Sequence, residues 1–155
     1  MNSWLCMTRE ENWNVIRSKR IWGVAEKDKK RLERVNVGDF LVFYVKQKRK
    51  KDEIVGAKIT SIFKAVSAPF FSQERIFASY LIELFPWRIK IQPEVTPKEP
   101  VEFQKLIPKL RFIKNKKNWG AHLQVVMRAI PEEDFNLIRS EIMHKRAPTA
   151  QRVPK

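Results

Sequence analysis

Two runs of branched and aromatic residues, separated by a short cationic segment, constrain the fold of this chain most. The runs cover residues 40–45 and 54–62, and Val, Ile, Phe and Tyr at this density are typical of strands. Gly38 precedes the first run and can adopt the positive φ of a tight turn. Residues 46–52 contain five Lys or Arg side chains. We therefore predict a hairpin with a basic loop, in which Gly56 marks a bulge or a close backbone approach.

The N-terminal segment combines a strand pattern with a helix pattern. Residues 3–7 are apolar, and the following helix is predicted from Glu10 to about Lys19. Thr8 is expected to cap this helix, with Glu11 as its capping-box partner.

Further elements follow from apolar periodicity and from the positions of proline and glycine. The first are an extended segment over 21–24 and a polar helix over 27–34, followed by strands over 76–84 and 87–91 or one long strand bent near Pro86. They continue with an extended connection through Pro93, Pro97 and Pro100, a helical turn over 103–106, a last strand over 122–126, and a helix after Pro131 that buries Phe135, Ile138 and Ile142. About five or six strands and fewer helices predict an α+β fold with a barrel-like sheet.

The length of 155 residues suits a single domain with its own core. We assign residues 1–143 to this domain. Residues 144–155 carry basic side chains without apolar periodicity, so we expect a disordered tail.

The charge balance narrows the choice of partner. The chain has 32 Lys and Arg against 17 Asp and Glu, a formal net charge of +15 and an isoelectric point near 10.2. A heat-adapted surface raises both signs together, whereas here the basic residues are nearly twice as numerous. An anionic partner relieves the self-repulsion, and nucleic acid is favoured over a partnerless solvated surface.

Cysteine content and the N-terminus bear on the compartment. Cys6 is the one cysteine, so an intramolecular disulfide is excluded, and Cys and His residues do not occur at metal-ligand spacing. The N-terminal apolar run is too short for a signal peptide, and no later run approaches the length of a membrane span. We expect a soluble, cytoplasmic, monomeric protein without metal or cofactor.

Two of the four glycines directly follow tryptophans, in Trp22-Gly23 and Trp119-Gly120. A glycine beside an indole lets a ligand or another backbone approach the ring. Two indoles could stack on a flat base, and Trp119 follows a dense cationic segment. The alternative is that both tryptophans are core residues next to turns. Trp4 and Trp13 are interpreted as interior residues, and Trp87 stays open between the two interpretations.

The sequence gives little support for a catalytic site. His122 and His144 lack a neighbouring nucleophile or carboxylate pattern, and Cys6 lies in a short apolar strand. The acids at residues 132–134 suit the start of a helix. Phosphate loops and the common hydrolase motifs do not occur. The sequence therefore favours a binding protein over an enzyme.

The order of several short motifs resembles the EVE domain, a PUA-like family related to YTH domains. The resemblance covers residues 3 to 138. It rests on Trp4-Leu5-Cys6, Asn12-Trp13, Ile21-Trp22-Gly23-Val24, residues 37–45 (VGDFLVFYV), residues 54–57 (IVGA) and residues 112–119 (FIKNKKNW). It implies a PUA-like fold, with a strongly curved mixed sheet or pseudo-barrel flanked by helices, and a pocket that accepts a flipped, often modified base between aromatic residues.

The resemblance also assigns site residues. Trp22 matches the first aromatic wall and Trp119 a second wall, while Thr8 and Arg9 match the strand end that supplies polar contacts. Gly23 stands where YTH domains carry Ser, and Thr8 stands nearest to the YTH Asn, so recognition of N6-methyladenine does not carry over. Modified cytosines are also associated with the family, and the base is left open. The expected pocket consists of Cys6, Thr8, Arg9, Trp22, Gly23, Val24 and Trp119.

Basic residues in two segments are expected to hold phosphates. They are Lys46, Lys48, Arg49, Lys50, Lys51, Lys109, Arg111, Lys114, Lys116 and Lys117. The leading hypothesis is a module that captures a single, modified base of RNA or DNA. The alternatives are a shape-selective RNA or ribonucleoprotein component without a base pocket, and, with less support, an enzyme that acts on nucleic acid.

Overall fold

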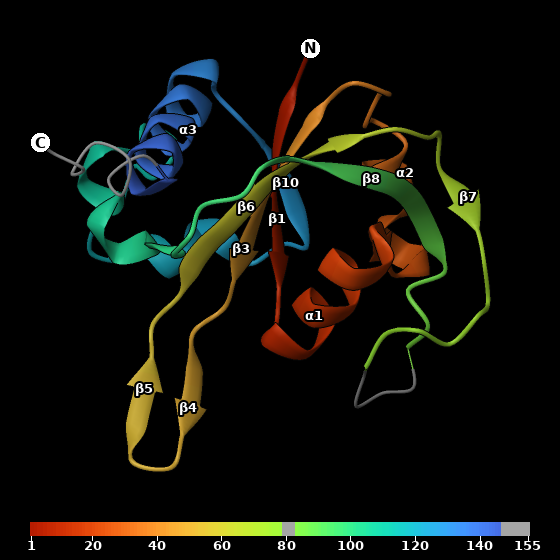
Figure 1. Ribbon diagram of the computed structural model, residues 1–155, viewed down its shortest axis with the longest axis horizontal. Helices are drawn as coiled ribbons and strands as arrows, with labels where there is room; N and C mark the ends of the chain where they lie inside the picture. Colours follow the sequence, from red (N-terminus) through yellow and green to blue (C-terminus); the bar gives the residue numbers. More distant parts are fainter. Residues whose placement is uncertain (79–82, 147–155) are drawn as a thin grey trace, which may run out of the picture.

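The computed structural model describes residues 1–78 and 83–146 (Figure 1). Most of these residues surround one curved mixed sheet of eight strands. Its main path runs β10-β1-β3-β6-β8-β2, β7 pairs with β8, and β9 pairs with β6. The strands are β1 (Ser3–Thr8), β2 (Ile21–Val24), β3 (Phe40–Val45), β6 (Lys58–Ala65), β7 (Phe70–Phe71), β8 (Trp87–Val95), β9 (Val101–Glu102) and β10 (Met127–Ile130).

The sheet curls where β6 and β8 change partners along their length. β6 pairs with β9 at Lys58 and Ile59 and with β8 from Ile62 to Ala65. β8 pairs with β6 through Ile91 to Val95 and with β2 through Trp87 to Lys90. β1 and β3 run parallel, and the other pairs are antiparallel. Figure 1 shows β8 bending across the sheet toward α1 and β7. The predicted α+β fold with a strongly curved mixed sheet is confirmed.

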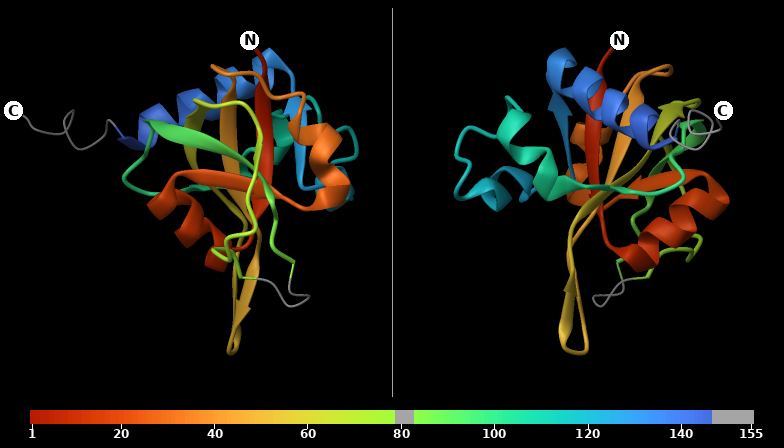
Figure 2. Two further views of the ribbon diagram at one scale, coloured as in Figure 1. Left: turned by 90° about the vertical axis from the view of Figure 1, so that its right-hand side faces the viewer. Right: turned by 60° about the vertical axis from the view of Figure 1, so that its left-hand side comes forward.

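Helices cover both faces of this sheet (Figures 1 and 2). Short 3-10 turns supplement three α-helices. The helical elements are α1 (Glu10–Lys19), η1 (Glu26–Asp28), α2 (Lys29–Leu32), η2 (Phe103–Lys105), η3 (Ile107–Lys109), η4 (Trp119–Leu123) and α3 (Glu132–Arg146). None of the described helices is long and apolar enough to cross a membrane.

The central strands are apolar on both faces and therefore bury two separate cores. In β3, Val42 and Tyr44 pack with Phe135 and Ile138 of α3, whereas the alternate residues contribute to the core beneath α1 and α2. Side chains of a strand alternate between faces, so one apolar run supplies both cores. The predicted buried face of α3, which includes Ile142, is confirmed.

The hairpin predicted from residues 40–45 and 54–62 is formed by β3 and β6, which pair antiparallel, and its basic tip extends away from the body as a two-stranded ribbon (Figures 1 and 2). It consists of β4 (Lys48–Lys50) and β5 (Glu53–Val55), and all six of these residues are exposed. The turn before β3 contains Gly38 with a φ of 97°, as predicted. Gly56 follows the ribbon, and a Cβ there would meet no atom within 4 Å, so the expected close approach is wrong.

The N-cap prediction for α1 is wrong. Arg9 is the N-cap residue and makes no side-chain cap bond. Thr8 is the last residue of β1 and pairs with Val45, so its hydroxyl lies outside the first helical turn and donates to the Arg9 carbonyl at 3.3 Å. The helix from Glu10 to Lys19 is confirmed.

The last strand lies further along the chain than predicted. Residues 122–126 were expected to form it, but η4 ends at Leu123 and the strand is β10. Backbone pairing with β1 begins where the Met7 amide donates to the Val126 carbonyl at 2.9 Å. Met127 and Ile130 are the residues that bury their side chains there.

The region around β8 also departs from prediction. The described parts of the segment 76–84 are not strand, and residues 79–82 lie outside the described residues. β8 continues through Pro93, which was expected in a connection. Pro93 pairs with Phe63 next to a register shift, where a residue without an N–H is tolerated.

Strand number and helix length were also misjudged at short elements. β7 and β9 have two residues each, too few to produce a sequence pattern, so the expected five or six strands fall short of eight. The polar helix over 27–34 is reduced to η1 and α2. The domain boundary at 143 stays a prediction: α3 continues to Arg146, and residues 147–155 lie outside the described residues.

Candidate functional site

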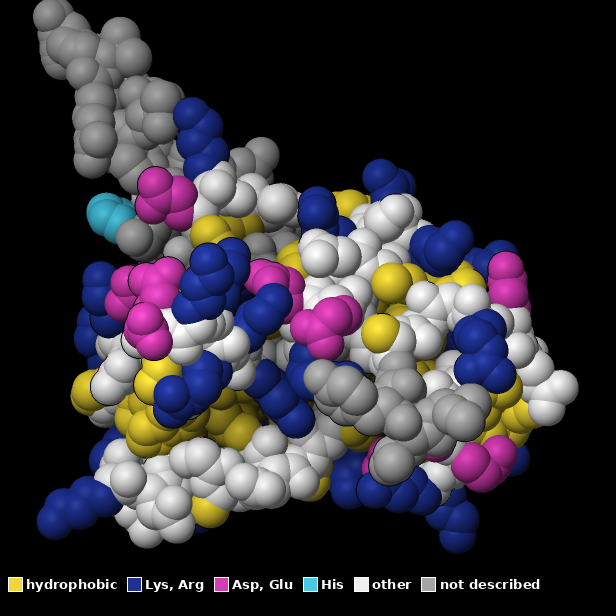
Figure 3. All heavy atoms as spheres, turned by 90° about the horizontal axis from the view of Figure 1, so that it is seen from below, with side chains coloured by type: hydrophobic (Ala, Val, Ile, Leu, Met, Phe, Trp, Pro, Cys, Tyr) yellow, Lys and Arg dark blue, Asp and Glu magenta, His cyan; other side chains and the backbone are white. Residues whose placement is uncertain are grey.

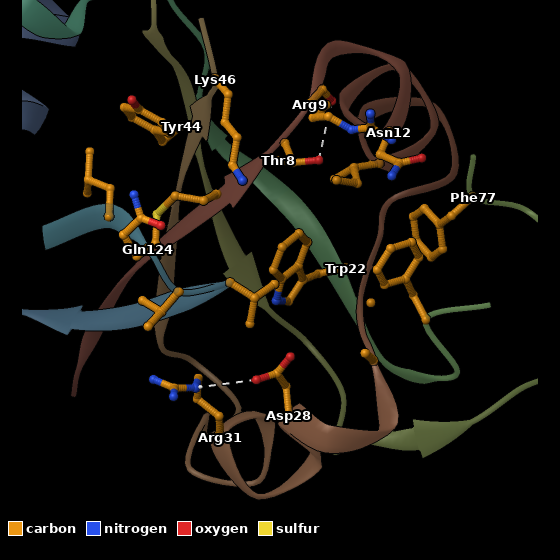
Figure 4. A pocket seen from close by; sticks show the side chains of 18 of the residues that line it. Thr8, Arg9, Asn12, Trp22, Asp28, Arg31, Tyr44, Lys46, Phe77 and Gln124 are labelled. Carbon is orange, nitrogen blue, oxygen red and sulfur yellow. Dashed lines mark hydrogen bonds and ion pairs between the residues drawn. The ribbon is translucent and has the colours of Figure 1, made fainter. Parts of the chain in front are cut away.

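A cavity of about 790 Å³ is lined by residues of β1, α1, β2, η1, α2, β3 and η4, and its lining includes members of both cores. Figure 4 shows Trp22 at its centre, with Thr8, Arg9 and Lys46 on one side and Asp28 and Arg31 on the opposite side. The described lining residues are Met7, Thr8, Arg9, Asn12, Ile16, Trp22, Gly23, Ala25, Lys27, Asp28, Arg31, Tyr44, Lys46, Gln47, Phe77, Phe85, Trp119, Gly120, Leu123, Gln124, Val125 and Val126.

Trp22 is fixed by the sheet and by a second aromatic ring. It pairs with Ile89 in the β2–β8 ladder, and its ring meets the edge of Phe43 at 5.5 Å between centroids. The side chain is 2% exposed, yet Nε1 has no hydrogen-bond partner among the described residues. A buried donor without an acceptor is costly. The Nε1 atom is itself buried, so only an acceptor that packs directly against the indole can reach this N–H.

The packing of neighbouring residues of the chain requires a glycine at position 23. A Cβ at this position would lie 2.7 Å from Phe77 Cε2 and 2.9 Å from the Phe85 carbonyl oxygen. The glycine thus lets the segment before β8 pack on β2 and bring the Phe77 ring to the cavity. Gly120 has no such role, because a Cβ there would meet nothing within 4 Å.

The segment that carries Phe77 is anchored from two directions. The Asn12 side chain donates to the Ala78 carbonyl at 3.0 Å and accepts from the Ala78 amide at 2.7 Å. Arg88, 1% exposed, donates to the carbonyls of Glu74 at 2.6 Å, Leu84 at 2.9 Å and Phe85 at 3.0 Å. Burial lowers the pKa of Arg88, which nearby Glu74 partly offsets.

The charges around the cavity are predominantly basic. Four basic side chains and one acidic side chain occur among its described lining residues. Asp28 Oδ1 lies 3.7 Å from Arg31 Nε, and Arg31 also donates to the Met127 carbonyl at 3.3 Å. In Figure 4 the Lys46 amine points toward the cavity interior. An anionic group is thus favoured at either side of Trp22.

Aromatic residues also line the side of the cavity nearest η4. Trp119, half-buried, packs on Phe103 at 5.6 Å between ring centroids, and Phe103 meets Tyr44 at 4.8 Å. Burial raises the pKa of Tyr44 to about 12, so its hydroxyl stays protonated at neutral pH and can donate. Gln124 adds an exposed amide on this side. Both predicted walls, Trp22 and Trp119, therefore line one cavity.

Two predicted pocket residues do not face the cavity. Cys6 and Val24 are fully buried in the core and are absent from its described lining. Cys6 belongs to the same core as Trp22, whereas its neighbour Met7 points to the opposite core, and of these two β1 residues Met7 reaches the cavity. Burial raises the pKa of the Cys6 thiol well above its usual value. Thr8, Arg9 and Gly23 do line the cavity, as predicted.

The predicted phosphate-binding residues fall on two exposed segments. Lys46 reaches the cavity, whereas Lys48, Arg49, Lys50 and Lys51 lie on the β4–β5 ribbon. Lys48 Nζ contacts Glu10 Oε1 at 2.9 Å. Side chains of the second segment are exposed and lie beyond the cavity; these are Lys109, Arg111, Lys114, Lys116 and Lys117.

Two basic residues of the second segment already contact other groups of this chain. Arg111 Nη1 lies 2.8 Å from Glu133 Oε2, and Lys116 Nζ donates to the Leu110 carbonyl at 2.5 Å. Figure 3 shows the molecule from the side of the ribbon, where Lys and Arg side chains border a hollow with apolar side chains. No group of three potential metal-ligating His, Cys, Asp or Glu side chains occurs among the described residues.

Sequence reasoning missed the residues that the fold brings to the cavity from a distance. They are Asp28, Arg31, Tyr44, Phe77, Phe85 and Gln124. Asp28 and Arg31 had a local signal, since an acid and a base three positions apart share a helix face directly after Trp22-Gly23-Val24. Phe77 and Gln124 lie in segments without regular periodicity, and sequence alone gives no signal for them.

Comparisons with known proteins agree on one family. The EVE domain model matches residues 2–141. A UPF0310 protein of Pyrococcus abyssi is 46% identical over 142 residues, covering 90% of this chain and 99% of the relative. A UPF0310 protein of Pyrococcus horikoshii is 40% identical over 147 residues, covering 92% and 100%.

Solved structures share the fold at low sequence identity. Human THYN1 in complex with DNA that contains 5-methylcytosine has a TM-score of 0.61 and 14% identity, covering 91% of this chain and 97% of that chain. The Pho92 YTH domain in complex with m6A has a TM-score of 0.63 and 12% identity, covering 91% and 82%. With its curved mixed sheet, its pair of tryptophans on one cavity and the family match over residues 2–141, the chain belongs to the EVE domain family.

Proposed function

We propose that this protein binds nucleic acid by capturing a single modified base in the cavity around Trp22. The observation that carries the proposal is that Trp22 and Trp119, far apart in sequence, line one cavity bordered by basic side chains. Aromatic rings stack on any base, and cations hold the adjoining phosphates. The volume of about 790 Å³ lies within the range of about 300–1,000 Å³ that is usual for small organic ligands.

Two structural relatives support the ligand class. THYN1 was solved with DNA containing 5-methylcytosine and the Pho92 YTH domain with m6A. The lining of the present cavity offers donors from Trp22 and Tyr44 and an acceptor from Asp28 for the edge of a base. This set leaves both modified cytosine and modified adenine as candidates, on RNA or on DNA.

The ribbon β4–β5 is assigned a less selective role. Its exposed Arg49 and Lys50 can contact phosphates of any sequence, because such contacts carry no base information. The protein acts as a monomeric cytoplasmic binding module and not as an enzyme. The burial of the Cys6 thiol supports the last point alone, because a buried thiol is a poor nucleophile.

The test compares two half-buried tryptophans. Trp119 lines the cavity, and Trp87 lies outside its described lining, with Nε1 donating to Glu26 at 2.9 Å. Trp119→Ala should weaken binding of oligonucleotides carrying 5-methylcytosine or N6-methyladenine by about tenfold or more, because a stacked base is worth about 1–3 kcal/mol. Trp87→Ala should bind the same oligonucleotides with the affinity of wild type. Fluorescence anisotropy with matched unmodified strands gives the preference for the modified base.

Trp22 itself requires a conservative variant because it is a core residue. Trp22→Phe keeps an aromatic ring but removes the Nε1 donor, and should reduce the preference for the modified strand while salt-dependent binding persists. Equal affinity of wild type for modified and unmodified strands, with Trp119→Ala unchanged, would refute base capture. That result would favour recognition of shape alone.

A further inference from the structure

A second cavity next to the first is lined by three arginines. It has a volume of about 380 Å³, and Arg31, Arg34, Arg128 and His122 face it. Its described lining contains neither Asp nor Glu. The two cavities share Arg31, Gln124 and Val125, so they adjoin each other.

Each arginine is held in place by a contact with the fold. Arg31 donates to the Met127 carbonyl at 3.3 Å, with its Nε 3.7 Å from Asp28 Oδ1. The Arg34 guanidinium lies 5.4 Å from the Trp4 ring centroid. Ordered arginines lose less conformational freedom on binding than lysines on an open surface.

Arg128 extends the basic surface beyond the second cavity. Its guanidinium lies 4.6 Å from the Phe112 ring centroid, and its Nη1 donates to the His122 carbonyl at 3.3 Å. Arg128 also lines a third cavity together with Arg111, Lys114 and the Glu133 that pairs with Arg111. Arginines therefore follow one another from the edge of the first cavity toward the segment that contains Arg111.

We propose that Arg31, Arg34 and Arg128 form a phosphate-binding site for the phosphodiester next to the captured base. Planar guanidinium groups bind phosphate oxygens through paired hydrogen bonds. The site rests on the proposed function, because a base in the first cavity places its own backbone at the shared Arg31. The site holds the nucleic-acid backbone at a fixed distance from Trp22, which the exposed ribbon β4–β5 does not do.

The residues of this site were not predicted from the sequence. Arg31 and Arg34 lie in or after α2, and Arg128 lies on β10, so they meet only because η4 and α2 both border the end of β10. Residues 27–34 contain five Lys or Arg side chains, but they were interpreted as a polar helix, and the segment around Arg128 contains no such run. The shared cavity, and not the density of charge, identifies these arginines as phosphate ligands.

The test neutralises the two arginines that do not line the first cavity. Arg34→Gln/Arg128→Gln should weaken binding of a short single-stranded oligonucleotide by about tenfold, and reduce the slope of log affinity against log salt by about 0.7 for each lost phosphate contact. The control Lys19→Gln/Arg139→Gln removes the same charge at exposed positions that line neither cavity. It should change affinity less than twofold by screening arguments.

Three further arms separate the possible outcomes. The nucleosides N6-methyladenosine and 5-methyldeoxycytidine lack phosphate, so wild type and Arg34→Gln/Arg128→Gln should bind them with the same affinity. If the double variant lost as much affinity for the nucleosides as for the oligonucleotide, a phosphate role would be contradicted. The single variant Arg34→Gln, at an exposed position, should show a smaller loss of oligonucleotide affinity. It tests the site if the double variant does not fold. Inorganic phosphate that stabilises wild type against unfolding, without any arginine effect on the oligonucleotide, would identify a free-anion site and overturn the proposal.

The two proposals fail in different ways. If Trp119→Ala binds modified oligonucleotides with the affinity of wild type, base capture is refuted. An oligonucleotide affinity and salt slope for Arg34→Gln/Arg128→Gln that match the charge control refute the phosphate site, whatever Trp119→Ala does.

Discussion

The cavity around Trp22 and the ribbon β4–β5 lie on either side of Lys46, and they differ in almost every physical respect. Trp22 is 2% exposed and packed on Phe43, whereas every residue of the two ribbon strands is exposed. The cavity has fixed walls and a mixture of donors, acceptors and rings. The ribbon is held to the body by an ion pair between Lys48 and Glu10.

This difference separates selectivity from affinity. A buried site discriminates because an ill-fitting ligand leaves its polar groups unpaired. Exposed cations attract any polyanion and respond to salt. Variants of the cavity walls should therefore change stability and ligand preference, while variants of the ribbon should change affinity for all strands alike.

The largest expected loss of stability comes from Arg88, which anchors the Phe77 segment. Arg88→Met removes donors from three carbonyls and should lower the free energy of unfolding by about 2–4 kcal/mol, because buried acceptors are left unpaired. Urea denaturation measures the loss. The exposed Arg49→Met on the ribbon is the control and should leave stability unchanged. Equal stability of both variants would show that the Phe77 segment does not depend on Arg88.

The next effect separates the two Trp-Gly pairs. Gly23→Ala forces a Cβ to within 2.7 Å of Phe77 and 2.9 Å of the Phe85 carbonyl oxygen, and should cost about 1–3 kcal/mol through overpacking. Gly120→Ala meets no atom within 4 Å and should leave stability unchanged or raise it by up to about 1 kcal/mol. Thermal and urea unfolding compare the two. A tolerated Gly23→Ala would mean that Phe77 does not pack on β2.

The smallest effect concerns the base of the ribbon. The hydrogen bond and charge of Lys48 lower the pKa of Glu10 below its usual 4.5, and Lys58 and Lys50 add to this effect. A lowered carboxyl pKa stabilises the fold above the usual pKa, and this contribution is lost as pH falls through the lower folded-state pKa. Because Glu10 is exposed, Glu10→Gln should cost at most about 0.5 kcal/mol at pH 7.

Amide hydrogen exchange of the ribbon is the measurement for Glu10→Gln. Exchange should accelerate relative to wild type at neutral pH, and the difference should vanish below the folded-state pKa of Glu10. An effect of Glu10→Gln that persists in strong acid would contradict an ionic origin.

Much of the fold could be predicted from local patterns. The apolar runs identified β1, β3 and β6, and the acids after Pro131 marked α3 with its buried Phe135. Strands β7 and β9 could not be predicted because two residues carry no periodicity. β10 was misplaced because its pairing with β1 depends on a register that only the assembled sheet defines.

The candidate site was predictable where its residues adjoin regular strands. Trp22, Gly23 and Thr8 lie on or at the end of strands, and the family resemblance placed them together. Cys6 and Val24 were wrongly included, because the sequence does not show which residues of a buried strand point into a core and which line the cavity. Phe77 and Arg128 come from segments brought together by tertiary contacts, which composition and spacing do not encode. Arg31 had a local signal in its spacing from Asp28, but that spacing does not show that both residues reach the cavity.

The indole N–H resonances of the five tryptophans test the central claim most directly. Trp87 serves as the internal reference, because its Nε1 group already donates to Glu26 and it lies outside the described lining of the first and second cavities. On titration with an oligonucleotide that carries the modified base, the resonances of Trp22 and Trp119 should shift while that of Trp87 stays in place. Shifts confined to amides of residues 48–55, with Trp22 and Trp119 unmoved, would contradict base capture in the cavity.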